Sequence, residues 1–152
     1  MSSQTRYVIP SLGKFHERFG DAGWPVFRIC YGLFYIPHGC GKLFGWFNSN
    51  ITEVARAIES MGFLSGLAWA QLIGGLEVFG GLLLVLGLGT RLIASCFAAF
   101  MFVAAFFFHA QFGYFWVHGG MELPLLLWLL AVALMLRGGG EFSLDRKLGW
   151  EI

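Results

Sequence analysis

One carboxylate stands alone in the most apolar part of this sequence. Glu77 is the only charged residue between positions 64 and 88. In a helix, Ala70, Gly74 and Gly81 would share its face, and small residues of this kind let a neighbouring helix approach closely. The sequence predicts that Glu77 either binds substrate and exchanges protons or forms a structural pair with a polar side chain. The candidate partners are Arg28, His38 and Lys42.

Three further residues carry the chemistry of metal ligands. His118 and Glu122 are four positions apart, which on one helix places them on the same face, and His109 could approach across the preceding loop. Imidazole and carboxylate groups bind zinc, copper or non-haem iron. The alternative is that water satisfies both histidines and that Glu122 favours the positive end of the next helix. We adopt this alternative and expect no resident metal.

The sequence also limits the roles of Arg28 and of the cysteines. Arg28 either extends toward the nearest water or turns inward to pair with Glu77 or Tyr35. Cys30 and Cys40 would be roughly 15 Å apart along one helix. A disulfide requires Cα atoms within about 7 Å, so this pair cannot close.

Four apolar stretches must position these residues. The 152-residue chain is 57% hydrophobic, 18% aromatic and only 12% charged, whereas soluble domains carry roughly a quarter charged residues. We predict an all-α fold, an integral membrane four-helix bundle that forms one domain. Residues 1–23 would be an N-terminal segment without a cleavable signal, residues 52–59 a short surface helix and residues 137–152 a tail. The transmembrane helices are predicted at 24–43, 64–88, 92–110 and 120–136.

Lysine and arginine predict the orientation, because cytoplasmic loops are enriched in them. One side carries Arg6, Lys14, Arg18, Arg91, Arg137, Arg146 and Lys147, and the other only Lys42 and Arg56. Both termini are therefore expected in the cytoplasm. The aromatic loop at 110–119, which lacks lysine and arginine, suits the outer interface. By helix rise, Arg28 lies toward the inner side, Glu77 near the middle, and most other polar groups in the outer half.

The chain resembles the DoxX family of small bacterial membrane proteins. The segments that carry the resemblance are Arg28 with Gly32, HGCGKLFG at 38–45, GLEVFGGLLL at 75–84, LGLGTR at 86–91, His109, GMELPLL at 120–126 and GGGEFSLD at 138–145. The resemblance implies a four-helix bundle in the bacterial cytoplasmic (inner) membrane. The family is named for its likeness to a subunit of a thiosulfate:quinone oxidoreductase, and other members are linked to thiol-redox partners. The polar positions of the family match Arg28, His38, Lys42, Glu77, Arg91, His109 and Glu122.

These observations predict a subunit of a membrane oxidoreductase. A quinone or a small thiol or sulfur compound would bind in the outer polar cluster, and a partner subunit could supply electrons because no side chain here carries them. The residues expected to be catalytic are Glu77, His38 and His109, and those expected to bind are Arg28, Lys42, Glu122 and His118. The lack of a cysteine pair argues against a direct dithiol mechanism.

Two other functions stay open at this point. The chain could be a non-catalytic membrane scaffold, or a carrier of small solutes. Glycine-rich helix faces also permit a homodimer. The net charge of +1 gives no reason to expect nucleic acid as a partner.

Overall fold

The computed structural model describes residues 8–149, which contain helices and turns but no strand. The helices, in chain order, are α1 (Pro10–Phe19), η1 (Gly20–Ala22), α2 (Gly23–Phe44), η2 (Trp46–Asn48), α3 (Ile51–Ser60), α4 (Gly66–Gly75), η3 (Leu76–Gly80), α5 (Gly81–Leu86), α6 (Thr90–Val103), η4 (Ala104–Phe108), η5 (His109–Phe112), η6 (Trp116–His118), α7 (Glu122–Arg137) and α8 (Leu144–Leu148). Arg6 and the outer ends of the predicted segments 1–23 and 137–152 lie outside the described residues.

Four long helical rods form the body of the molecule. The first is α2, and the second joins α4, η3 and α5 into Gly66–Leu86. The third joins α6, η4 and η5 into Thr90–Phe112, and α7 is the fourth. The second and third are long and apolar enough to cross a bilayer. The predicted all-α membrane fold is confirmed, whereas the orientation of the termini stays a prediction.

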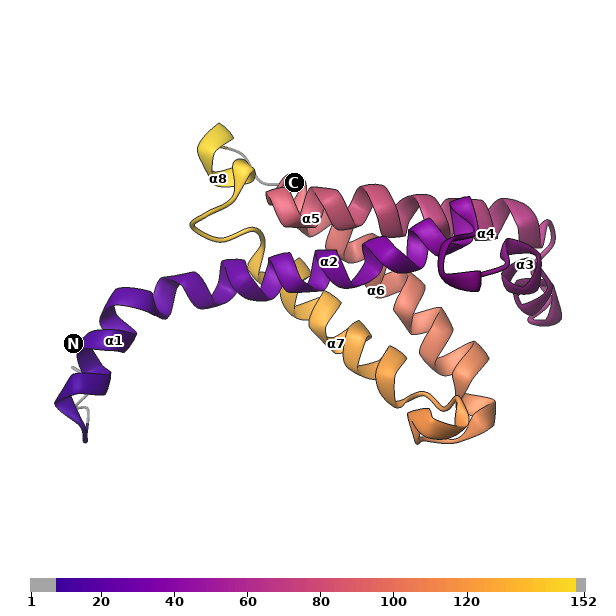
Figure 1. The fold of residues 1–152 in the computed structure, drawn as a ribbon, viewed down its shortest axis with the longest axis horizontal. Helices are drawn as coiled ribbons and strands as arrows, with labels where there is room; N and C mark the ends of the chain where they lie inside the picture. The colour runs from indigo at the N-terminus through magenta and orange to yellow at the C-terminus, as the bar shows by residue number, and fades with distance from the viewer. Residues whose placement is uncertain (1–7, 150–152) are drawn as a thin grey trace.

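The rods associate in two pairs, which we call the two arms. The first arm is α2 packed against α4, η3 and α5, and the second is α6 packed against α7. Figure 1 shows the arms side by side near α5 and diverging toward the opposite end, while α1 projects away from both. The short helix α3 packs on α4 at the far end of the first arm.

Backbone contact between glycines holds the first arm together. A Cβ on Gly32 would lie 2.5 Å from the carbonyl oxygen of Gly81, and one on Gly39 would lie 2.7 Å from that of Gly74. The two glycine pairs are seven residues apart on each helix, so the antiparallel contact repeats after two turns. The small-residue face predicted around Glu77 therefore contacts α2.

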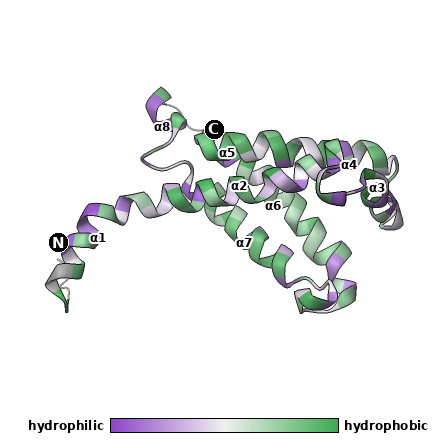
Figure 2. Cartoon of the chain, in the orientation of Figure 1, coloured by the Kyte–Doolittle hydropathy of each residue, from purple (hydrophilic) through white to green (hydrophobic). Residues whose placement is uncertain are grey.

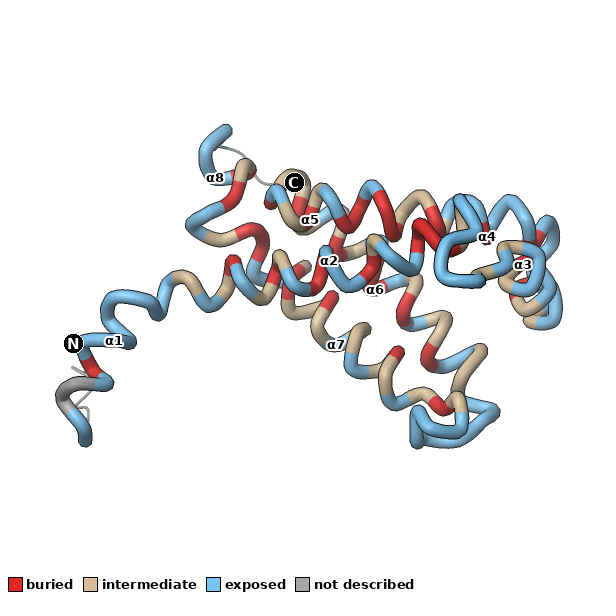
Figure 3. Tube along the Cα trace, in the orientation of Figure 1, coloured by how far each residue is buried: buried red, intermediate tan, exposed pale blue. Residues whose placement is uncertain are grey.

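The core lies where the arms meet. Tyr35, Leu84, Phe97 and Leu134 are at most 2% exposed, and they come from all four rods. Figure 3 shows buried segments at this junction, with others spread along the rods and near α8.

Large apolar side chains are exposed on the rods, and Figure 2 shows α4 to α7 as mostly hydrophobic. Leu72, Phe79, Phe107 and Leu136 are each more than 60% exposed. Lipid is the solvent that such a surface requires.

Adding one methyl group should test the glycine contact. We expect Gly39→Ala to destabilise the protein by about 1–3 kcal/mol, because the new Cβ must displace the backbone of α4. Gly75→Ala is the matched control, since a Cβ there meets nothing within 4 Å and alanine favours helix. Thermal unfolding in detergent would measure both variants. Equal midpoints for the two would show that the arm does not depend on this contact.

The native cysteines should test the membrane setting of two rods. Cys30 on α2 and Cys96 on α6 are exposed in the isolated chain, so lipid should cover them in the membrane. We expect a membrane-impermeant maleimide to leave both unlabelled in intact membranes and to label both after denaturation. Ser60→Cys, at the exposed end of α3, is the positive control. Rapid labelling of Cys96 in membranes would contradict the assignment of its rod as a span.

Candidate functional site

A row of hydrogen-bond donors runs along one side of α2. Trp24, Arg28, Tyr31, Tyr35 and Lys42 follow one another at intervals of three, four or seven residues, which keeps them on the same side of the helix. Each of them donates to another part of the chain through its indole, guanidinium, hydroxyl or ammonium group. The acceptors come from α7, from the segment after α7 and from η3, except that Tyr35 donates to the Tyr31 hydroxyl on α2 itself. We call this row the donor face.

Arg28 anchors the segment that follows α7. Its two terminal nitrogens donate to the carbonyl oxygens of Gly139 and Phe142, both at 2.9 Å, and the residue is 1% exposed. Trp24 donates to the carbonyl oxygen of Gly138 at the same distance. The prediction that Arg28 either extends to water or pairs with Glu77 or Tyr35 was wrong, because backbone carbonyls of this glycine-rich segment provide a closer acceptor.

Asp145 is a further polar residue at this end of the molecule, and it was not predicted as a site residue. Its carboxylate accepts from the backbone N–H groups of Gly89 and Thr90, at 2.6 and 2.9 Å, and caps the N-terminus of α6 from outside the helix. The residue is 1% exposed. A cap supplied from a position 55 residues away leaves no local pattern, and the sequence marks Asp145 only as the last residue of the family-like segment GGGEFSLD at 138–145.

The two tyrosines connect the arms. The Tyr31 hydroxyl lies 2.9 Å from the carbonyl oxygen of Leu127 on α7 and 3.2 Å from the Tyr35 hydroxyl. Since Tyr31 has one proton to donate and Leu127 offers only an acceptor, Tyr35 must donate to Tyr31. The tyrosine rings also pack on Phe97 of α6. The donor face thereby joins α2 to both helices of the second arm.

Lys42 and Glu77 form an ion pair within the first arm. The ammonium nitrogen lies 2.8 and 2.7 Å from the two carboxylate oxygens, and the side chains are 15% and 3% exposed. Glu77 lies eleven residues after the start of Gly66–Leu86 and nine before its end, close to the predicted middle of the bilayer. Of the three partners predicted for Glu77, Lys42 is the one that pairs with it.

A change of helix geometry accompanies this pair. Glu77 belongs to η3, a single π-helical turn between α4 and α5. A second π-helical turn, η4, ends immediately before His109. Such turns are frequent at functional sites, and neither was predicted from the sequence. Two of the three residues predicted to be catalytic therefore lie in or directly beside a π-helical turn.

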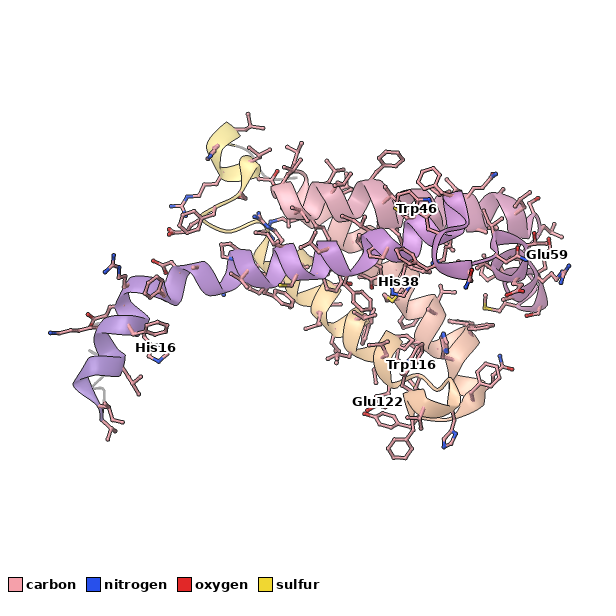
Figure 4. The ribbon with its side chains drawn as sticks, viewed as in Figure 1. His16, His38, Trp46, Glu59, Trp116 and Glu122 are labelled. Carbon is pink, nitrogen blue, oxygen red and sulfur yellow. The ribbon has the colours of Figure 1, made fainter. Side chains whose placement is uncertain are left out.

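His38 lies on the exposed side of α2, one turn before Lys42. Its ring packs against that of Phe34, with centroids 5.1 Å apart. Figure 4 shows it on the first arm, whereas Trp116 and Glu122 lie at the end of the second arm. No hydrogen bond or ion pair between residues 8–149 connects His38 or Lys42 with His109, His118 or Glu122. The predicted outer cluster is therefore divided into two groups.

The second group belongs to a compact loop, residues 109–122, which we call the aromatic cap. His109 Nδ1 is hydrogen bonded to the carbonyl oxygen of Gly119, and the Glu122 carboxylate accepts from the backbone N–H of Trp116. Backbone bonds from Met121 to Gly113 and from Glu122 to Tyr114 close the loop. Such internal pairing suits a loop at the edge of a bilayer, where backbone groups have few water partners.

His118 and Glu122 do not share a helix face, contrary to the prediction. His118 ends the short turn η6, and Glu122 begins α7. Between them Gly119 has a φ of +79°, a left-handed conformation that ends the turn. His118 itself is exposed. Within residues 8–149, no three His, Cys, Asp or Glu residues gather in a way that could hold a metal ion.

Arg91 closes the opposite end of the second arm. Its guanidinium donates to the carbonyl oxygens of Met135 and Leu136, at 3.2 and 2.7 Å. These are among the last carbonyls of α7, which have no partner within the helix. Arg91 therefore caps the C-terminus of α7.

Comparison with known proteins gives a family and a relative. The model of the DoxX family matches residues 23–110, which extend from α2 to the start of the aromatic cap. The chain is 28% identical over 137 residues to the inner membrane protein YqjF of Escherichia coli (strain K12), an alignment that covers 87% of this chain and 96% of that protein. No solved structure matches the chain.

The cap that Asp145 provides should be measurable. We expect Asp145→Asn to destabilise the protein by about 1–3 kcal/mol, because a neutral amide offers one acceptor in place of a charged carboxylate that binds two N–H groups. Glu141→Gln is the control, since that carboxylate is 51% exposed and paired only at the surface. Thermal unfolding in detergent would compare them. A midpoint for Asp145→Asn equal to that of the control would show that the cap contributes nothing.

Proposed function

Since the chain belongs to the DoxX family, we propose that this membrane protein is a subunit of an inner-membrane oxidoreductase. Its relative is named an inner membrane protein, which supports the location. The ligand would be the headgroup of a quinone, and a small thiol or sulfur compound would supply the electrons. The Lys42–Glu77 pair of the first arm would be the binding site.

The ion pair is the observation that carries this proposal. Removing two charges from water costs several kcal/mol for each ion, and apolar residues of similar volume would often serve stability as well or better. An ionisable pair near the middle of a span is therefore a sign of function. The π-helical turn at Glu77 supports the same assignment.

The pair has the groups that a quinone headgroup requires. The Lys42 ammonium has three N–H groups and uses two of them on the Glu77 carboxylate. The third can donate to a quinone carbonyl oxygen, and His38 one turn away offers another donor. Glu77 would exchange protons with the bound headgroup. His109, on the second arm, keeps its proposed role as a further proton acceptor through Nε2, since Nδ1 is engaged with Gly119.

The electrons must come from outside this chain. The three cysteines of the chain are unpaired, and none adjoins another. In the proposed reaction, two external thiols and one quinone give one disulfide and one quinol, so that two electrons and two protons pass to the quinone. The thiols would belong to a small substrate or to a redox partner subunit.

A scaffold function is the second candidate. The donor face is satisfied almost completely within the chain, as a bundle without a substrate would require. A role as a solute carrier has no comparable support. The two candidates differ in what the Lys42–Glu77 pair does after the bundle has folded.

Variants of the pair should separate the two candidates. We expect added quinone to raise the unfolding midpoint of the purified protein and to be reduced when a dithiol is supplied. Glu77→Gln should lower quinol formation by roughly 10²- to 10⁴-fold, the range for losing a general base. Lys42→Gln should weaken quinone binding by about tenfold, through one lost charged hydrogen bond.

Control variants distinguish a loss of folding from a loss of quinone binding. The double variant Lys42→Met/Glu77→Met leaves no unpaired charge, so it should fold but neither bind nor reduce quinone. Glu141→Gln, which breaks an exposed ion pair of equal length, should behave like the natural protein. If quinone neither stabilises the natural protein nor is reduced, the oxidoreductase proposal fails. If the double variant retains both responses, the pair is not the site.

A further inference from the structure

A small polar pocket lies at the end of the molecule where α1 meets α2. It has a volume of about 260 Å³. Its walls come from η1, the first turn of α2, the end of α7 and the segment that follows. The lining residues are Asp21, Trp24, Arg137, Gly140, Glu141 and Arg146.

The charges of this pocket are balanced and half of them are paired. Arg146 and Glu141 form an ion pair at 2.7 Å. No ion pair with another of residues 8–149 engages the other two charged residues, Arg137 and Asp21. The pocket therefore offers one unpaired guanidinium and one unpaired carboxylate to a ligand.

Trp24 fixes the position of the unpaired guanidinium. Its indole N–H donates to the carbonyl oxygen of Gly138, which holds the ring in place. The guanidinium carbon of Arg137 lies 4.6 Å from the centre of this ring, over its face. This cation–π contact orients the N–H groups of Arg137 and covers the aromatic face toward any other cation.

Helix α1 indicates that this end of the molecule lies at a bilayer surface. On α1, Leu12, Phe15 and Phe19 recur at intervals of three or four residues, and each is at least 50% exposed. Figure 3 shows most of α1 exposed, and Figure 1 shows it projecting from the end of α2. An apolar stripe on a helix continuous with such a rod fits the boundary between headgroups and acyl chains.

Exposed apolar side chains lie next to the charged residues of the pocket. Leu136 and Phe142, neighbours of the lining residues in sequence, are 69% and 64% exposed. Trp24 is a residue type that gathers at membrane interfaces. A ligand in the pocket would therefore have its polar part among charges and its remainder beside exposed apolar side chains.

We propose that this pocket binds the headgroup of a zwitterionic phospholipid that carries a primary amine. The lipid phosphate would accept hydrogen bonds from Arg137, a guanidinium suited to phosphate. The lipid ammonium would donate to Asp21. One unpaired cation and one unpaired anion match one phosphate and one ammonium, whereas an anionic lipid would leave Asp21 unpaired. A quaternary ammonium could not donate to Asp21, and Arg137 already covers the ring of Trp24.

Native mass spectrometry of the full chain would test this site, which is independent of the proposed redox function. The protein would be released from nanodiscs that contain equal parts of phosphatidylethanolamine, phosphatidylglycerol and phosphatidylcholine. We expect retained phosphatidylethanolamine to exceed each of the others by about tenfold, as expected for one charged hydrogen bond. Arg137→Gln and Asp21→Asn should each remove this preference.

Control variants and ligands make the outcome decisive. Arg56→Gln and Glu53→Gln remove exposed charges from α3, outside the pocket, and should preserve the preference. Arg137→Lys keeps the charge and should retain part of the binding if Arg137→Gln proves unstable. Preference for phosphatidylglycerol, or a preference that survives both pocket variants, would overturn the proposal. Equal binding of the soluble headgroup glycerophosphoethanolamine would assign the pocket to a solute instead of a lipid.

Discussion

A polar group that leaves water must find its partner within the chain, and this constraint organises the structure around one helix. In α2 the buried polar side chains are donors, and all but Tyr35, which donates to Tyr31 on the same helix, find their acceptor on another element. Arg28 donates to backbone carbonyls of the segment after α7, and Tyr31 donates to the carbonyl of Leu127. Lys42 donates to the carboxylate of Glu77. Since each acceptor lies on a different element, satisfying one helix fixes the positions of the others.

The pairing of Lys42 with Glu77 also depends on the glycines. A short ion pair between helices requires their axes to be close, and the contacts of Gly39 with Gly74 and of Gly32 with Gly81 provide this. Larger residues at these positions would move the carboxylate away from the ammonium. The close contact between the glycines therefore sets the geometry of the Lys42–Glu77 ion pair.

Several features of the fold could be predicted from the pattern of side chains along the sequence. The four rods, the short helix at 51–60 and the glycine face around Glu77 follow from hydropathy and spacing. Features that depend on backbone groups could not be predicted, because every residue has a carbonyl. The partners of Arg28 and the cap from Asp145 belong to this class. The π-helical turns and the division of the polar cluster are likewise set by packing between rods.

The hydrogen bonds are distributed unevenly along the arms, and this bears on where a ligand can enter. Near α5, the arms and the segment after α7 are joined through Arg28, Asp145 and Arg91. Toward the opposite end, beyond the middle of the first arm, none of the hydrogen bonds between residues 8–149 links Lys42 or Glu77 to the aromatic cap. Elements move relative to one another most readily where few polar contacts hold them. The quinone proposed above would therefore separate the arms most easily where they diverge (Figure 1), while the joined end near α5 would stay in place.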